Sequence, residues 1–180
     1  SGIVTATGND GGSGIGGGQK YRNTNTGGGG TVIINGGTVT ANGQNLGSDI
    51  GRGEGNTTTG VCIILGGTVT ATNGKFGTNA GIKVNEDGTL EVYGDLTLPA
   101  DITIPEGKTL IIPSGTTLTV PEGVTLTNNG TIINNNGFTN NGTVINNGTF
   151  TNNGNLVETN HNYTNGFCIC GEYELAEEKD

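Results

Sequence analysis

The chain is poor in the residues that fill a thick hydrophobic core or span a membrane. It has no methionine and no tryptophan, and aromatic residues make up 4% of it. Hydrophobic residues reach only 30%, and no apolar run approaches the roughly 20 residues that a membrane helix requires. We therefore expect neither a compact globule with one large core nor insertion into a membrane.

Positive charge is scarce as well. The 7 Lys and Arg residues are scattered among 16 Asp and Glu residues, which gives a formal net charge of −9. Nucleic-acid binding rewards clustered Lys and Arg, so this balance argues against nucleic acid as a partner. The N-terminus has no signal-peptide pattern, and we expect the sequence to be a fragment of a longer, exported chain.

Glycine, in contrast, is abundant, with 37 residues among 180. Chains rich in Gly, Asn and Thr are often disordered linkers, but disorder gives no reason to keep apolar residues in register. Here a Gly-x-Val-Thr-Ala motif recurs at 2–6, 37–41 and 67–71. From about residue 96 the spacing between successive apolar residues shortens to eight residues and then to six, with Asn pairs between the apolar positions. The sequence is therefore a repeat array.

The three repeat lengths fit one pattern if three short strands make one coil of a solenoid. The sequence then predicts an all-β fold, a single-stranded parallel β-helix of about six tapering, three-sided coils with a short C-terminal cap. Irregular coil lengths favour the right-handed form. We expect long coils over residues 1–95, short coils over 96–157 and a Cys/His-containing capping tail over 158–180.

Each side of the coil should stack one inward column of apolar residues. Strand residues alternate between the two faces, so the positions between these columns point outward. The predicted columns are Val4, Val39, Val69, Leu96, Leu118, Phe138 and Leu156; Ile15, Ile50, Ile82, Ile102, Leu126 and Val144; and Val32, Cys62, Leu90, Leu110, Ile132 and Phe150.

Two segments carry a resemblance to known proteins. Residues 12–18 (Gly-Ser-Gly-Ile-Gly-Gly-Gly) and 34–41 (Ile-Asn-Gly-Gly-Thr-Val-Thr-Ala) resemble the glycine-rich right-handed β-helix repeats of surface proteins from anaerobic gut bacteria. The tail from His161 to Gly171 is similar to short His…Cys-x-x-Cys-Gly tails of such proteins, with one residue of the Cys spacing missing. The resemblance implies export and a cell-surface role as an adhesin or carbohydrate-binding protein.

We accordingly expect a non-catalytic cell-surface adhesin or glycan-binding module, secreted and monomeric. Tyr21 and Arg22 lie in the longest predicted loop and are the expected contacts to a glycan or host surface ligand. A purely structural stalk of a larger surface protein is the alternative function.

Enzymes and metal sites are further alternatives. Polysaccharide lyases and hydrolases often use parallel β-helices, and Asp49, Arg52 and Glu54 interrupt a glycine-rich segment. Asp49 and Glu54 could also offer oxygen ligands to Ca²⁺. In the tail, His161, Cys168 and Cys170 are three possible zinc ligands, although a closed site needs four. A disulfide in the tail, with no metal, is the competing interpretation.

Ice binding is the last alternative. The outward neighbours of the first column would form a row of threonines, and flat threonine arrays occur in ice-binding solenoids. Strands favour threonine in any case, which supplies a structural explanation for the same row. The row contains Thr5, Thr40, Thr70, Thr97, Thr119 and Thr139.

Overall fold

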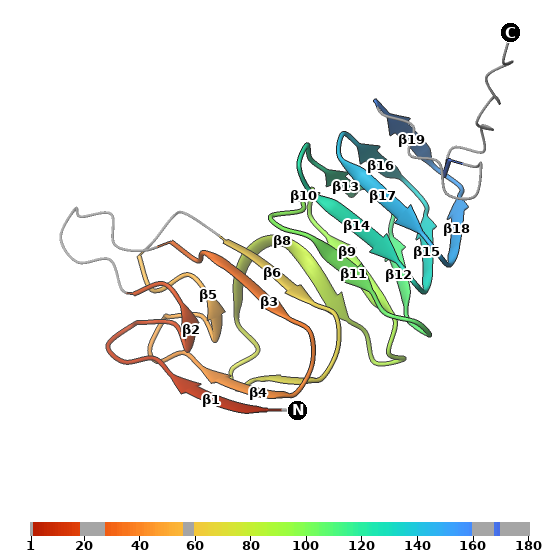
Figure 1. The fold of residues 1–180 in the computed structure, drawn as a ribbon. Coiled ribbons are helices and arrows are strands. Elements are labelled where there is room, and N and C mark those ends of the chain that lie inside the picture. Colours follow the sequence, from red (N-terminus) through yellow and green to blue (C-terminus); the bar gives the residue numbers. More distant parts are fainter. Residues whose placement is uncertain (1, 19–27, 56–59, 160–167, 170–180) are drawn as a thin grey trace, which may run out of the picture. The chain divides into compact units, whose positions relative to one another are not determined.

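The computed structural model describes residues 2–18, 28–55, 60–159 and 168–169. In this part of the chain it contains 19 β-strands and no helix, which confirms the prediction of an all-β fold. The strands pair in parallel throughout the pairings that follow (Figure 1). By contacts the chain divides into two compact units, Ser1–Val84 (unit 1) and Asn85–Asp180 (unit 2).

Unit 1 builds six parallel pairings from eight strands. Strands far apart in the sequence lie side by side, so that β1 pairs with β4 and β4 with β7. In the same way β2 pairs with β5, β5 with β8, and both β3 and β8 with β6. The strands are β1 (Ile3–Thr7), β2 (Ile15–Gly16), β3 (Thr31–Ile34), β4 (Thr38–Asn42), β5 (Ile50–Gly51), β6 (Gly60–Ile64), β7 (Thr68–Ala71) and β8 (Phe76–Val84).

The predicted first column of unit 1 is confirmed by the register. Val4 pairs with Val39, and Val39 pairs with Val69. Alternation along β4 buries Val39 and Ala41 while Thr38 stays exposed and Thr40 is half-buried. A buried cluster joins the residues of this sheet to those of β3, β5 and β6, with members Ile34, Val39, Ala41, Ile50, Cys62 and Ile64.

The second column departs from its prediction. Ile15 pairs with Ile50 as expected, but the residue opposite Ile50 is Phe76 and not Ile82. Ile82 instead pairs with Ile63, and Gly81 stands opposite Cys62, where Leu90 was expected. The reason is that β8 is one nine-residue strand whose start pairs with β5 and whose remainder pairs with β6.

A bulge allows β8 to serve both partners. Gly60 pairs with Thr78 and Val61 with Ala80, so Asn79 is an extra residue in the ladder. Such bulges bend a strand and increase its twist locally, which redirects it.

Unit 2 is more regular, because every strand pairs with the strand three places further on. Three parallel sheets result, in the orders β9-β12-β15-β18, β10-β13-β16-β19 and β11-β14-β17. The strands are β9 (Leu90–Tyr93), β10 (Leu96–Thr97), β11 (Ile102–Ile104), β12 (Thr109–Ile112), β13 (Thr117–Val120), β14 (Thr125–Asn128), β15 (Thr131–Asn134), β16 (Gly137–Asn140), β17 (Thr143–Asn146), β18 (Thr149–Asn152) and β19 (Asn155–Glu158).

The apolar columns of unit 2 match the prediction. The registers join Leu96, Leu118, Phe138 and Leu156 in one sheet and Ile102, Leu126 and Val144 in another. The third column joins Leu90, Leu110, Ile132 and Phe150. Phe138 and Phe150 belong to different sheets, yet their rings meet edge to face at 5.2 Å. These two sheets therefore face a common interior.

Asparagine amides continue this interior at the strand ends. Asn128, Asn134 and Asn140 have no solvent-exposed surface. The Asn134 Nδ2 donates to Asn152 Oδ1 at 2.7 Å and to the Asn155 carbonyl at 3.0 Å, and its Oδ1 accepts from the Asn136 N–H. Asn128 makes equivalent bonds, whereas Asn140 donates to Glu158 Oε1 and accepts from the Gly142 N–H. The buried amides thus have partners for both polar atoms, as buried polar groups require.

Replacing one buried amide should test this ladder. Asn134→Asp keeps the shape but turns the donating nitrogen into an oxygen that faces two acceptors. We expect it to lower the free energy of unfolding by about 2–4 kcal/mol at neutral pH. The matched control is Asn153→Asp, because Asn153 makes a similar bond to Asn135 at an exposed position. Urea denaturation measures both, and equal losses in the two variants would contradict the prediction.

Candidate functional site

The carboxylate of Asp49 accepts four hydrogen bonds within unit 1. Its side chain is fully buried. Oδ1 accepts from the Gly43 N–H at 2.8 Å and the Asn73 Nδ2 at 2.9 Å, and Oδ2 accepts from the N–H groups of Asn73 and Lys75 at 2.8 and 3.0 Å. Asp49 therefore ties the segment before β5 to the segment between β7 and β8.

These bonds determine the ionisation of Asp49. Burial alone would raise its pKa, but the hydrogen bonds from Lys75, Gly43 and Asn73 outweigh that effect and hold the pKa below the ordinary 3.8. Four donors already surround the carboxylate, which gives Asp49 a structural role, and calcium ligation by Asp49 stays a prediction. Glu54, the other predicted calcium ligand, is half-buried, and its N–H donates to the Gly11 carbonyl.

Glycine dictates how closely the segments around Asp49 can stack. Gly16, Gly51 and Gly77 follow the inward residues Ile15, Ile50 and Phe76 in register. Gly51 has a φ of +119°, and a Cβ there would lie 2.6 Å from the Gly77 backbone. A side chain at this position would force the strands apart, so glycine is required.

The zinc prediction falls largely outside the described residues. His161 and Cys170 are not described, whereas Cys168 is buried and disulfide-bonded. A sulfur held in a disulfide is not a thiolate, so Cys168 does not offer zinc a ligand in this state. Throughout the described ranges, no group of three or more His, Cys, Asp or Glu residues is placed to hold a metal ion.

Tyr21 and Arg22, the expected ligand contacts, lie outside the described residues. Arg52 is described and exposed, and its backbone pairs with Ser48 and Gly77. The structure therefore places Asp49, Arg52 and Glu54 on one segment but directs the Asp49 carboxylate into the protein.

Threonine rows cover the outer faces of two sheets. Thr5, Thr40 and Thr70 are in register in unit 1, and Thr97, Thr119 and Thr139 are in register in unit 2. Each half of the predicted threonine row is thus confirmed within its own unit. A parallel row in unit 1 joins Ile3, Thr38 and Thr68.

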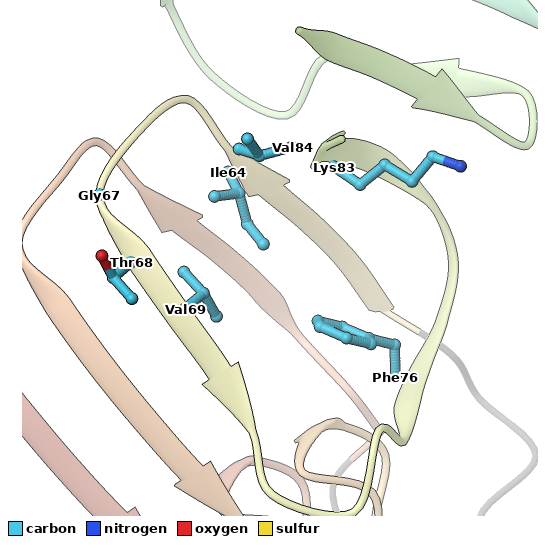
Figure 2. A pocket seen from close by; sticks show the side chains of 7 residues that line it. All are labelled: Ile64, Gly67, Thr68, Val69, Phe76, Lys83 and Val84. Atoms are coloured by element: carbon cyan, nitrogen blue, oxygen red, sulfur yellow. The ribbon is translucent and has the colours of Figure 1, made fainter. Parts of the chain in front are cut away.

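An apolar hollow in unit 1 was missed by sequence reasoning. It has a volume of about 480 Å³ and lies where Val69, Ile64 and Phe76 point toward one another, while Lys83 extends away from them (Figure 2). Phe76 remains 47% exposed. A signal for Phe76 existed, because Phe76-Gly77 repeats the Ile15-Gly16 and Ile50-Gly51 pairs. The full lining is Ile64, Gly67, Thr68, Val69, Phe76, Lys83 and Val84.

Comparison with known proteins finds none that is similar to this chain. No protein-family model matches it, and neither a curated protein nor a solved structure is found to be similar. Among the described residues there is also no helix that is long and apolar enough to cross a membrane. The function must therefore be argued from the residues themselves.

Acid should destabilise unit 1 through Asp49. A folded-state pKa below the unfolded value means that the carboxylate stabilises the fold above about pH 4. This contribution is lost as the pH falls through the folded pKa. Asp49→Asn should remove the acid-sensitive part and lower the free energy of unfolding at pH 7 by about 3 kcal/mol, since an amide nitrogen would face backbone donors.

The control for Asp49 is Asp101→Asn. Asp101 is exposed and accepts the Thr125 N–H through one oxygen, a bond that asparagine can preserve. Urea denaturation between pH 3 and 7 compares the two variants. An Asp49→Asn variant as stable as the Asp101→Asn variant would refute the structural role.

The Cys62 thiol should be chemically silent in the folded protein. It is 1% exposed, and burial raises its pKa to about 11. We expect labelling by a thiol reagent at pH 8 to be slow in buffer and fast in denaturant, because both access and the thiolate are lacking when folded. Mass spectrometry of the Cys62 peptide measures the two rates, and equal rates would contradict the structure.

Proposed function

We propose that the chain forms a right-handed parallel β-helix of an exported bacterial surface protein, which binds glycans without catalysing a reaction. The strand order supports the β-helix: when every strand pairs with the strand three places on, three strands complete one coil. The edge-to-face contact of Phe138 and Phe150 supports an interior shared by different sides of that coil.

The observation that carries the function is the regular placement of hydroxyl and amide groups on the outside. Threonine rows follow the sheets, and exposed asparagine pairs join neighbouring repeats, as in the 2.9 Å bond from Asn147 Nδ2 to Asn129 Oδ1. Hydroxyl and amide groups are the donors and acceptors that sugars use. An extended glycan, itself a repeating molecule, suits a surface that repeats at about 4.8 Å per strand.

A non-catalytic role is supported by the use of the Asp49 carboxylate. Glycoside hydrolysis needs a pair of carboxyl groups that face the bond to be cleaved. The Asp49 carboxylate instead accepts four hydrogen bonds from groups within unit 1. We further propose that the protein is a secreted, cell-surface monomer and that Tyr21 and Arg22 contact the glycan.

The test is retention on immobilised host and plant polysaccharides, with the supernatant assayed for shortened sugars. We expect retention without cleavage and its loss in a Tyr21→Ala/Arg22→Ala variant. Arg52→Ala is the control, since it removes an equal positive charge from a described, exposed position.

Each other outcome overturns part of the proposal. Release of shortened sugars that depends on Arg52 or Glu54 would show an enzyme. Failure to bind any polysaccharide would favour the stalk function, in which the β-helix holds another domain away from the cell. Retention that survives in the double variant would remove Tyr21 and Arg22 from the site.

A further inference from the structure

The outer face of β1, β4 and β7 carries an almost unbroken array of threonines. The three strands are in register from Ile3–Thr38–Thr68 through Thr5–Thr40–Thr70 to Thr7–Asn42. Thr72 lies in the turn after β7 and is not part of the array, because its hydroxyl donates to the Ala41 carbonyl at 3.0 Å. The eight outward positions of the three strands thus hold six threonines, one isoleucine and one asparagine.

The side chains of this array face solvent. Val39 and Ala41 of the central strand are buried at 7% and 0% exposure, so the alternate residues Thr38 and Thr40 point outward. Thr5, Thr38, Thr68 and Thr70 are exposed, and Thr40 at the centre is half-buried among them. Ile3, at one corner, is 81% exposed. None of the eight outward positions carries a charge.

Backbone geometry holds these hydroxyl and methyl groups in a fixed lattice. Neighbouring strands lie about 4.8 Å apart, and alternate residues along a strand lie about 6.7 Å apart. The β-branched threonine side chain is stiff at χ1, so little rotamer entropy remains to be lost on binding. The face is therefore an ordered, two-dimensional set of hydroxyl and methyl groups.

This lattice is close to that of hydrogen-bonded ice. Water molecules joined by hydrogen bonds of about 2.75 Å in tetrahedral geometry place second neighbours about 4.5 Å apart. Along the direction in which layers of these tetrahedra stack, the ice lattice repeats after 8/3 of the bond length, or about 7.3 Å. Both distances lie within about a tenth of the spacings of the threonine array.

The chemistry of the face suits an ordered solid better than a small dissolved molecule. A single exposed hydroxyl gains little from binding because liquid water competes for its hydrogen bonds. A solid whose repeat matches the array engages many groups at once, and the methyl groups and Ile3 add apolar contact. From this we propose that the outer face of β1, β4 and β7 binds ice. The proposal rests on the threonine register and is independent of glycan binding.

The experiment observes ice crystals growing in micromolar solutions of the purified chain and measures the gap between melting and freezing temperatures. We expect faceted crystals and a measurable gap for the natural sequence. Thr40→Lys should abolish both, because a long charged side chain at the centre of the array prevents close approach. The control, Thr103→Lys, changes an exposed threonine of β11 and should leave both unchanged.

Further variants keep the result decisive. Thr70→Lys places the same charge at an exposed position of β7 and should also abolish activity; thermal melting establishes that each variant is folded. Undistorted crystals with the natural sequence, or activity that survives in folded Thr40→Lys or Thr70→Lys, would overturn the proposal. Polysaccharide retention that is lost in Thr40→Lys, without any effect on ice, would assign this face to glycans instead.

Discussion

Parallel, in-register pairing is the constraint on which this structure depends. Each residue of unit 2 lies beside the residue at the same position of the neighbouring repeat, as Leu118 lies beside Phe138 and Leu156 lies two strands further on. A side chain must therefore tolerate a near copy of itself about 4.8 Å away. Like charges fail this condition, whereas valine packs on valine and an asparagine amide can both donate to and accept from another. The low charge and the many Val, Thr and Asn residues follow from this requirement.

Unit 1 meets the same constraint with fewer apolar side chains and more glycine. Its second sheet has very short strands, β2 and β5, which give it little hydrogen bonding of their own. Gly51 permits close stacking, and Asp49 supplies the order that apolar packing supplies in unit 2. A buried carboxylate is tolerated because backbone N–H groups from two segments converge on it, which offsets the cost of removing the charge from water.

Repetition made most of the fold predictable and hid the exceptions. The columns through Leu118, Leu126 and Leu110 could be predicted because equal spacing forces equal positions to stack. Ile82 was assigned wrongly because β8 is one long strand that begins opposite β5 at Phe76 and continues along β6, and an apolar pattern does not show where one strand changes partners. The role of Asp49 was equally hidden: its partners are mostly backbone N–H groups, one of them 26 residues away, and backbone groups have no sequence signature. The repeated pairs Ile15-Gly16, Ile50-Gly51 and Phe76-Gly77 would have identified Phe76 as the residue opposite Ile50.

The same constraint limits what the outer surface can recognise. Because the strands stack in register, each outward residue becomes part of a row. A surface such as Thr5–Thr40–Thr70 therefore presents one chemical group several times instead of several different groups at one point. Catalysis needs the second arrangement, in which unlike groups converge on a single bond. Rows suit partners that are themselves periodic, whether a polysaccharide or a crystal plane. Sites with unlike groups must therefore arise where repetition breaks, and in the described part of unit 1 these places are the Asp49 segment and the Phe76 hollow. At the first of them the unlike groups already bond to one another, which leaves the periodic faces and the Phe76 hollow as the surfaces open to a ligand.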